Sequence, residues 1–145
     1  MREILFRGKC PDTGRWYEGQ YIHMHKTTFC VAEDYERYPD NDIHQIVFEE
    51  MTDWGLPNRH LRADVLPETV GQFTGVIDKN GKRIYEGDMV LSYDMFGRKD
   101  DCGVVNWNDL FCAWHVGKNS MYGDRIATYE VIGNIYDGEE EEQYG

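Results

Sequence analysis

Apolar and polar residues alternate along much of the chain, which is the pattern of half-buried β-strands. The pattern is clearest in residues 71–90. Asn80-Gly81 divides this stretch, and Asn followed by Gly tolerates the positive φ angles of a two-residue type I′ turn. The sequence therefore predicts a β-hairpin that reverses at Asn80-Gly81, with Gly87 at a bulge or tight corner after it.

Further strands are predicted on both sides of this hairpin, because short alternating runs there are rich in aromatic and β-branched residues. They are residues 3–8, 16–22, 43–48, 89–93, 103–107, 111–116 and 129–136. Three polar or irregular segments are expected to be loops or connectors. They are residues 33–42, 51–64 and 94–101. An amphipathic helix is the alternative for the region around 33–42, although Pro39 and Asn41 oppose a long one. We expect Trp107, Phe111 and Trp114 to contribute much of the core.

Length and composition favour a folded, mainly β protein. The 145 residues suffice for one domain or for two small ones that share a core. Apolar residues make up 41% and aromatic residues 14%, so a packed core is expected. We predict an N-terminal β-rich or α+β subdomain (residues 1–66), a second domain packed against it (67–137) and a disordered acidic tail (138–145).

Several blocks of sequence resemble a known family. They are Gln72–Gly75, Asp78–Gly81, Ile84–Asp88 and Tyr129–Tyr136, with a weaker opening pattern at Ile4–Gly8 and Gly14–Trp16. In this order and spacing they are similar to the signature of the YopX family of bacteriophage and prophage proteins. The resemblance implies a mostly β fold whose C-terminal part is a small SH3-like barrel, encoded by a mobile element. It implies no established biochemical activity, and it carries nothing over to residues 28–64.

The net charge of −12 argues against nucleic acid as the main partner. Residues 139–142 contribute four of these charges. An acidic surface repels nucleic acid at long range, because phosphate binding needs Lys and Arg. No run approaches the roughly 18 apolar residues of a membrane span, and the N-terminus lacks the apolar region of a secretory signal. We therefore expect a cytoplasmic protein without membrane contact.

The cysteine spacing favours free thiols. Four cysteines lie far apart, and none forms a Cys-x-x-Cys pair. In a reducing cytoplasm we expect them to be unpaired and mostly buried.

One local group of residues keeps a nucleic-acid hypothesis open. Small barrels bind single strands with aromatic platforms beside a basic groove. The candidate interaction patch combines cations at the central hairpin and in the loop expected to face it with two tyrosines. Its residues are Lys79, Lys82, Arg83, Tyr85, Tyr93, Arg98 and Lys99.

Two histidines are the only hint of a metal site. His23 and His25 are two residues apart on a predicted strand, so their side chains share a face. His44, His60 or Cys30 would have to complete the coordination, and the spacing does not show that they do. We expect ordinary polar residues at a strand end, with no metal and no cofactor.

Three carboxylates gather around the central hairpin, and paired carboxylates can divide acid and base roles. Asp78, Glu86 and Asp88 are better explained by turns, where a carboxylate accepts local backbone hydrogen bonds. No nucleophile–histidine set follows from spacing. The sequence predicts no catalytic residue.

The leading hypothesis is a non-enzymatic phage or prophage accessory protein that acts as an interaction module. Two small β units leave sheet edges and aromatic surface that another copy would cover, so a homo-oligomer is expected. A host or phage protein is the further class of partner. The alternatives are a nucleic-acid-binding small barrel and an enzyme with an unrecognised site.

Overall fold

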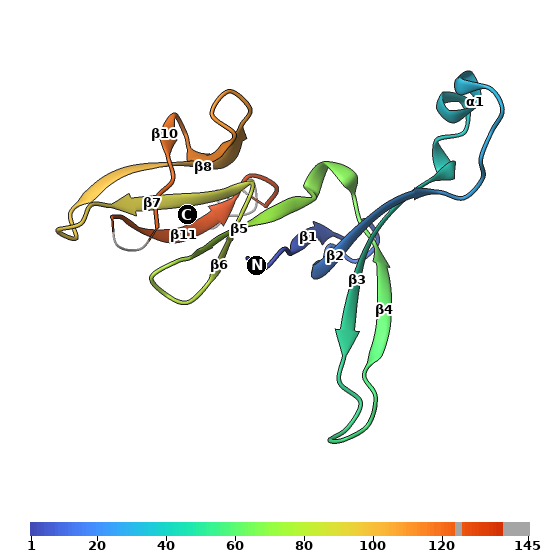
Figure 1. Ribbon diagram of the computed structural model, residues 1–145, viewed down its shortest axis with the longest axis horizontal. Coiled ribbons are helices and arrows are strands. Elements are labelled where there is room, and N and C mark those ends of the chain that lie inside the picture. The colour runs from blue at the N-terminus through green and yellow to red at the C-terminus, as the bar shows by residue number, and fades with distance from the viewer. Residues whose placement is uncertain (124–125, 138–145) are drawn as a thin grey trace. The chain divides into compact units, whose positions relative to one another are not determined.

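The computed structural model describes residues 1–123 and 126–137. The described chain forms two compact units, each built of antiparallel strands (Figure 1). The first unit is Leu5–Val70, and the second combines Met1–Ile4 with the chain from Gly71 onward. The predicted disordered tail, residues 138–145, lies outside the described residues.

The first unit is a twisted set of antiparallel strands in the order β4-β3-β2-β1. These are β1 (Phe6–Lys9), β2 (Trp16–His25), β3 (Asp42–Glu50) and β4 (Arg59–Asp64). Three short helices connect or follow them: α1 (Ala32–Arg37), η1 (Pro39–Asn41) and η2 (Pro67–Thr69).

Two segments of this unit differ from the sequence prediction. The expected loop 33–42 contains α1, whose acidic first turn and basic last turn complement the helix dipole, and Pro39 follows its end. The expected connector 51–64 contains β4, in which half-buried Leu61 and Ala63 alternate with exposed polar residues. Gly and Pro at the start of that segment masked this short alternation.

A close backbone approach holds the register of β2 against β3. Tyr21 lies opposite Ile46, whose side chain is fully buried. A Cβ added at Gly19 would lie 2.1 Å from the carbonyl oxygen of Val47, so only glycine fits there. If β2 shifted by one residue against β3, a residue with a side chain would replace Gly19 beside the Val47 carbonyl. Ile46 would then face the opposite side of the sheet.

The second unit contains a hairpin and a five-stranded sheet. The hairpin is β5 (Gly71–Ile77) with β6 (Arg83–Tyr85). The sheet has the order β10-β9-β8-β7-β11. Its strands are β7 (Asp88–Tyr93), β8 (Lys99–Asn108), β9 (Ala113–Val116), β10 (Asn119–Ser120) and β11 (Thr128–Asn134).

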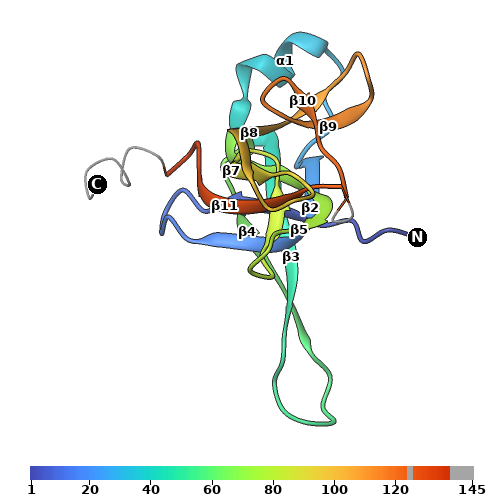
Figure 2. The same cartoon turned by 90° about the vertical axis from the view of Figure 1, so that its left-hand side faces the viewer.

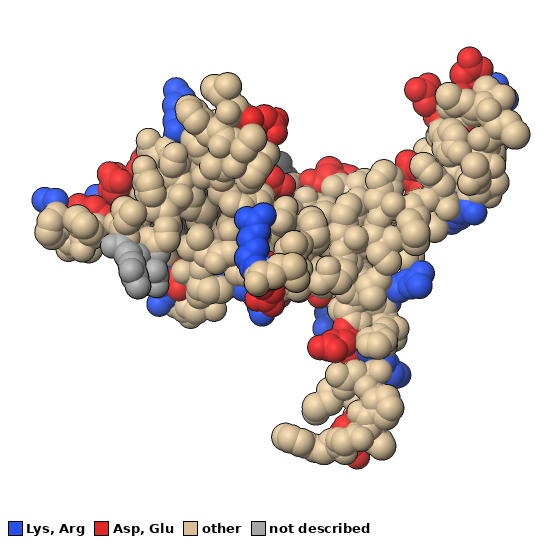
Figure 3. All heavy atoms as spheres, viewed as in Figure 1, with Lys and Arg blue, Asp and Glu red and all other residues tan. Residues whose placement is uncertain are grey.

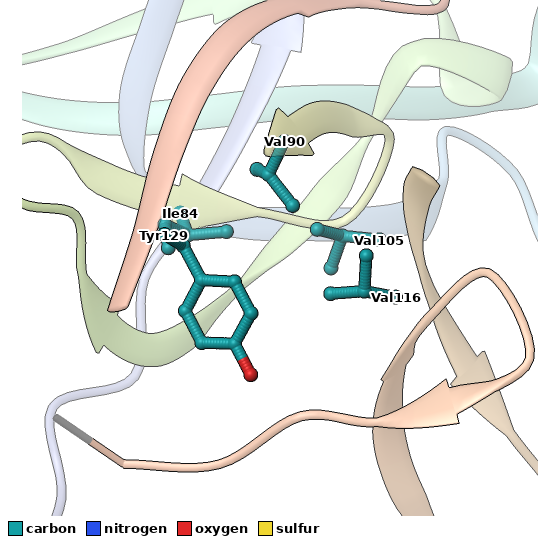
Figure 4. Close-up of a cluster of buried hydrophobic side chains, with 5 residues drawn as sticks. All are labelled: Ile84, Val90, Val105, Val116 and Tyr129. Carbon is teal, nitrogen blue, oxygen red and sulfur yellow. The ribbon is translucent and has the colours of Figure 1, made fainter. Parts of the chain in front are cut away.

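The core of this unit joins the hairpin to the sheet. Ile84 of β6 packs with Val90, Val105, Val116 and Tyr129, which come from four strands of the sheet (Figure 4). The mainly β prediction is confirmed. The SH3-like barrel is not confirmed, because the sheet formed by the described residues is not closed and has β10 and β11 as its two edges.

Two of the three aromatic residues expected in the core lie at the surface. Trp107 is 41% exposed and Phe111 is 67% exposed. Phe111 precedes β9, in a turn where its N–H donates to Asn108 Oδ1 at 3.0 Å. Trp114 is half-buried and packs against the core. The short β-branched residues fill the interior instead.

The central hairpin forms as predicted, but its turn is of another type. Gly81 has a φ of 85°, whereas Asn80 is not among the residues with positive φ. The Gly81 N–H donates to the Asp78 carbonyl at 3.1 Å, and the Asp78 N–H donates to the Lys82 carbonyl at 2.7 Å. This is a three-residue loop with glycine in the left-handed position, not a type I′ turn.

The cysteines are free, as expected, but they are not mostly buried. Cys10 is half-buried, and Cys30, Cys102 and Cys112 are exposed. The prediction of buried thiols was wrong because each of these residues lies in or beside a loop or at an exposed strand end. Within the described residues, no helix has the length and apolar character needed to cross a bilayer.

Replacing Gly19 with alanine should destabilise the first unit by about 1–3 kcal/mol, because backbone has to move to admit the methyl group. Gly123→Ala is the matched control, since a Cβ there meets no atom within 4 Å. Urea unfolding measures both variants. Equal stability of the two would show that the close approach at Gly19 does not hold the register.

Candidate functional sites

The β3–β4 hairpin forms an arm whose tip carries exposed apolar side chains. β2 pairs with β3 only up to Val47, so the arm, residues 48–61, pairs only within itself. It extends away from the rest of the first unit in both views (Figures 1 and 2). At its tip, residues 51–58, Met51 is 65% exposed, Trp54 is 88% exposed and Leu56 is 59% exposed.

Local hydrogen bonds give the arm tip a defined conformation. The Leu56 N–H donates to the Asp53 carbonyl at 3.2 Å, and Gly55 has the positive φ of 78° that suits the third position of a type II turn. The Asp53 carboxylate accepts the Trp54 N–H at 2.7 Å. The Thr52 hydroxyl donates to the Pro57 carbonyl at 2.9 Å. Trp54 is therefore presented by an ordered turn.

The candidate interaction patch is only partly brought together. Lys79 Nζ lies 2.8 Å from Glu130 Oε2 and 4.6 Å from the centre of the Tyr93 ring, and the Tyr93 hydroxyl donates to the same Glu130 oxygen at 3.0 Å. The hydrogen bond with Glu130 raises the pKa of Lys79, and the bonds from Lys79 and then Tyr93 lower the pKa of Glu130. The cation of Lys79 is thus balanced by a carboxylate on β11.

The other patch residues are dispersed. Arg83 lies 3.7 Å from the Glu3 carboxylate, and Arg98 lies 3.0 Å from that of Asp94. Lys82 and Lys99 are exposed. Tyr85 is only 2% exposed, which corrects its place in the patch, because its ring packs beside Phe73 instead of facing solvent.

The surface charges are mixed on the face in view. Lys and Arg side chains are scattered among Asp and Glu and do not merge into a continuous basic strip on the visible described residues (Figure 3). Nucleic-acid binding would need such a strip. The dispersion of the candidate interaction patch, whose cations Lys79, Arg83 and Arg98 each lie beside a carboxylate, weighs against that alternative.

Histidines from two neighbouring strands form a cluster. His23 lies opposite His44, and their rings stack with centroids 4.2 Å apart. His25 lies opposite Asp42, with Nε2 3.0 Å from Oδ1. Burial, and then the neighbouring His23, lower the pKa of His44.

The sequence offered His44, His60 and Cys30 as further ligands for a metal ion held by His23 and His25. Of these three, the structure places His44 beside His23. His44 belongs to a group of three residues that can hold a metal ion, with His23 and Asp42. Among the described residues, neither His60 nor Cys30 belongs to such a group. Asp42 was not considered from sequence, because a strand pairing over this distance has no local signal.

Asp78 and Asp88, weighed above as acid–base candidates, have structural roles. Asp78 is 5% exposed, and its two carboxylate oxygens accept the N–H groups of Asn80, Lys82 and Val131 at 2.8–3.0 Å. Asp88 is 1% exposed and accepts the Tyr85 N–H at 2.8 Å. Both carboxylates hold backbone in place, which is the structural interpretation made from the sequence.

A hollow of about 300 Å³ lies in the second unit. Its lining includes the exposed Asp100 and Asp101 together with the buried Tyr129, and it contains no described His, Cys or Lys. Burial raises the pKa of Tyr129, whose oxygen accepts the Tyr122 N–H at 2.9 Å. Its described lining thus offers no histidine that could pair with a nucleophile.

Comparison with known proteins supplies the family. The family model described as YopX protein matches residues 5–140. The chain belongs to the YopX family. No match is found among curated proteins. YopX membership suggests a phage-type protein of unknown function, so the activity has to be argued from the sites themselves.

The feature that sequence reasoning missed is the arm tip. Residues 51–58 lie within the region to which the YopX resemblance carried nothing over, and they were assigned to a connector. Thr-Asp-Trp-Gly at 52–55 holds a usable signal, because Asp before an aromatic residue and Gly favours a turn. A tryptophan in a turn between two strands is poorly placed for burial.

Acid should destabilise the second unit through Asp78. Burial acts to raise the pKa of this carboxyl, but hydrogen bonds from Val131, Lys82 and Asn80 outweigh it and lower the pKa. A lowered pKa means that the stabilisation is complete above the unfolded value of about 4 and is lost as the pH falls through the folded value. Asp78→Asn should cost about 2–4 kcal/mol at pH 7 and flatten the acid dependence.

Denaturant unfolding at several pH values measures this effect, with the exposed Asp109→Asn as the control. The wild type and the control should lose stability below about pH 4, and Asp78→Asn should lose less. If all three proteins showed the same acid dependence, Asp78 would not be the group responsible.

Proposed function

We propose that this protein is a non-enzymatic, cytoplasmic accessory protein of a phage or prophage that works as a protein-interaction module and self-associates. The observation that carries the proposal is the arm tip, where an ordered turn holds Trp54 at 88% exposure. Tryptophan is enriched among the residues that dominate binding energy at protein interfaces.

The composition of the arm tip favours a protein partner. Single exposed apolar residues are common, but Met51, Trp54 and Leu56 share one loop of the arm. Because hydrogen bonds within the loop already order it, binding would spend little conformational entropy. Trp54 alone presents roughly 150–250 Å² of side-chain surface for burial.

A second copy of the chain is the partner to which this proposal commits. The outer strand β4 carries exposed charged side chains at Arg59, Arg62 and Asp64, which oppose pairing of sheet edges between copies. The arm tip has no described charge except Asp53, whose carboxylate is engaged with the Trp54 N–H. Association through the tip would bury less than a standard interface, so a weak, concentration-dependent oligomer is expected.

The proposal also includes an SH3-like fold for the second unit, since small barrels of that kind serve as interaction modules. Contacts between the β5–β6 hairpin and the five-stranded sheet support it. Ile84 packs in the core with residues of four sheet strands, and the Lys79 N–H donates to the Tyr129 carbonyl at 2.9 Å. These contacts curl the chain over one face of the sheet, as strands of a small barrel do.

Trp54→Ser should weaken self-association by about 2 kcal/mol or more, roughly 30-fold in the dissociation constant. Sedimentation velocity over a range of protein concentrations measures it. Leu110→Ser is the matched control, because Leu110 is 84% exposed in a different loop. The control should associate like the wild type.

Two results would contradict the proposal. A wild type that sediments as a strict monomer at tens of micromolar would remove self-association. Equal weakening by Trp54→Ser and Leu110→Ser would assign association to exposed apolar surface in general and not to the arm. Capture of a host or phage protein by the monomer, lost in Trp54→Ser, would move the partner from a second copy to that protein.

A further inference from the structure

Four polar side chains share one face of the β2–β3 ladder at the end away from the arm. In the antiparallel register His23 is opposite His44 and His25 is opposite Asp42. Alternate residues of a strand point to the same face, so all four side chains lie together. His23, Asp42 and His44 each offer a ligand atom, and these atoms lie within 4.8 Å of one another.

We propose that His23, Asp42 and His44 form a binding site for a divalent first-row transition metal ion, with Zn²⁺ as the representative. Imidazole nitrogens and carboxylate oxygens are the ligands such ions take. Around a tetrahedral ion with bonds of about 2.0–2.1 Å, ligand atoms lie roughly 3.4 Å apart. The ligand atoms lie within 4.8 Å of one another at present, and rotation of the exposed His23 and Asp42 side chains would bring them to the separation that coordination requires.

A hydrogen bond orients His44 for coordination. Its Nδ1 lies 2.5 Å from the Tyr21 hydroxyl oxygen. With Nδ1 protonated and donating to this oxygen, the lone pair of the ring is on Nε2, which is left for the ion. Metal-binding histidines commonly use their second nitrogen in this way, which fixes the tautomer and the ring orientation.

His25 positions the carboxylate ligand. Its Nε2 lies 3.0 Å from Asp42 Oδ1, and its ring packs against Tyr35 of α1 with centroids 4.8 Å apart. The residue before Asp42 is also fixed, because the buried Asn41 side chain accepts the Thr27 N–H at 2.8 Å and donates to the Thr27 carbonyl at 2.9 Å. These bonds join the two ends of the segment between β2 and β3 next to the site.

Three protein ligands leave one position of a tetrahedral ion for water or for a side chain of a partner. The ion would link β2 to β3 beside the α1 segment, so binding should also stabilise the folded chain. Without an ion, the same geometry would be a stack of two imidazoles, His23 on His44, beside a histidine–carboxylate pair. A metal site and a metal-free stack of imidazoles differ in two respects: whether a metal ion binds to the protein, and which histidines its binding requires.

Isothermal titration of the untagged full chain with Zn²⁺, and with Co²⁺ to record its visible absorption, tests the proposal. One ion should bind per chain. His23→Ala and His44→Ala should each weaken binding at least about tenfold, and His25→Ala should weaken it by roughly 10–100-fold through the carboxylate it orients. His60→Ala is the matched control, because His60 is exposed on β4, and it should bind like the wild type.

A rise in melting temperature with Zn²⁺ that is present in the wild type and absent in His23→Ala would give independent support. His23 is exposed, so this variant should fold even if His44→Ala, which loses the bond to Tyr21, does not. The proposal fails if the wild type binds no ion. It also fails if His23→Ala binds as tightly as His60→Ala, since that would mark general surface histidine binding.

Discussion

The pairing of β2 with β3 is the constraint on which the functional features of the first unit depend. The backbone contact between Gly19 and Val47 and the burial of Ile46 fix this register. Pairing of β3 with β2 ends at Gln20–Val47, and beyond this pair β3 continues with β4 alone as the arm. In the other direction it brings His44 and Asp42 opposite the two histidines of β2. One alignment of two strands thus positions both the proposed interaction surface and the proposed metal site.

The second unit is organised around the buried carboxylate of Asp78. It joins the loop after β5 to strand β11, 53 residues later, by accepting the Val131 N–H. The hairpin therefore packs Ile84 into the core instead of standing free in solvent. The same unit carries most of the sequence blocks on which the resemblance to the YopX family rests, and several of their residues have structural roles here: Gly81 and Asp78 build the turn, while Tyr85 and Asp88 are buried.

How far the sequence was informative depended on whether the signal was local. Alternation and turn residues predicted the hairpin around Asn80 and most strands, because these depend on neighbouring residues. The short alternation of β4, which closely follows Gly55 and Pro57, was missed. The sharing of a face by His23 and His25 followed from strand geometry, but their meeting with Asp42 depends on a pairing across a helical segment. The exposure of Trp54 had a local signal in the turn residues around it, but this signal was missed because composition favours burial of aromatic residues.

The central claim is the register of β2 on β3, and nuclear Overhauser contacts between backbone protons of the two strands test it most directly. The structure predicts cross-strand contacts for the pairs His23–His44 and Gln20–Val47. Hα–Hα or HN–HN contacts shifted by one residue, such as His23 with Ile43 or Gln45, would contradict it. Such a slip would separate the metal ligands onto two faces and change the start of the arm.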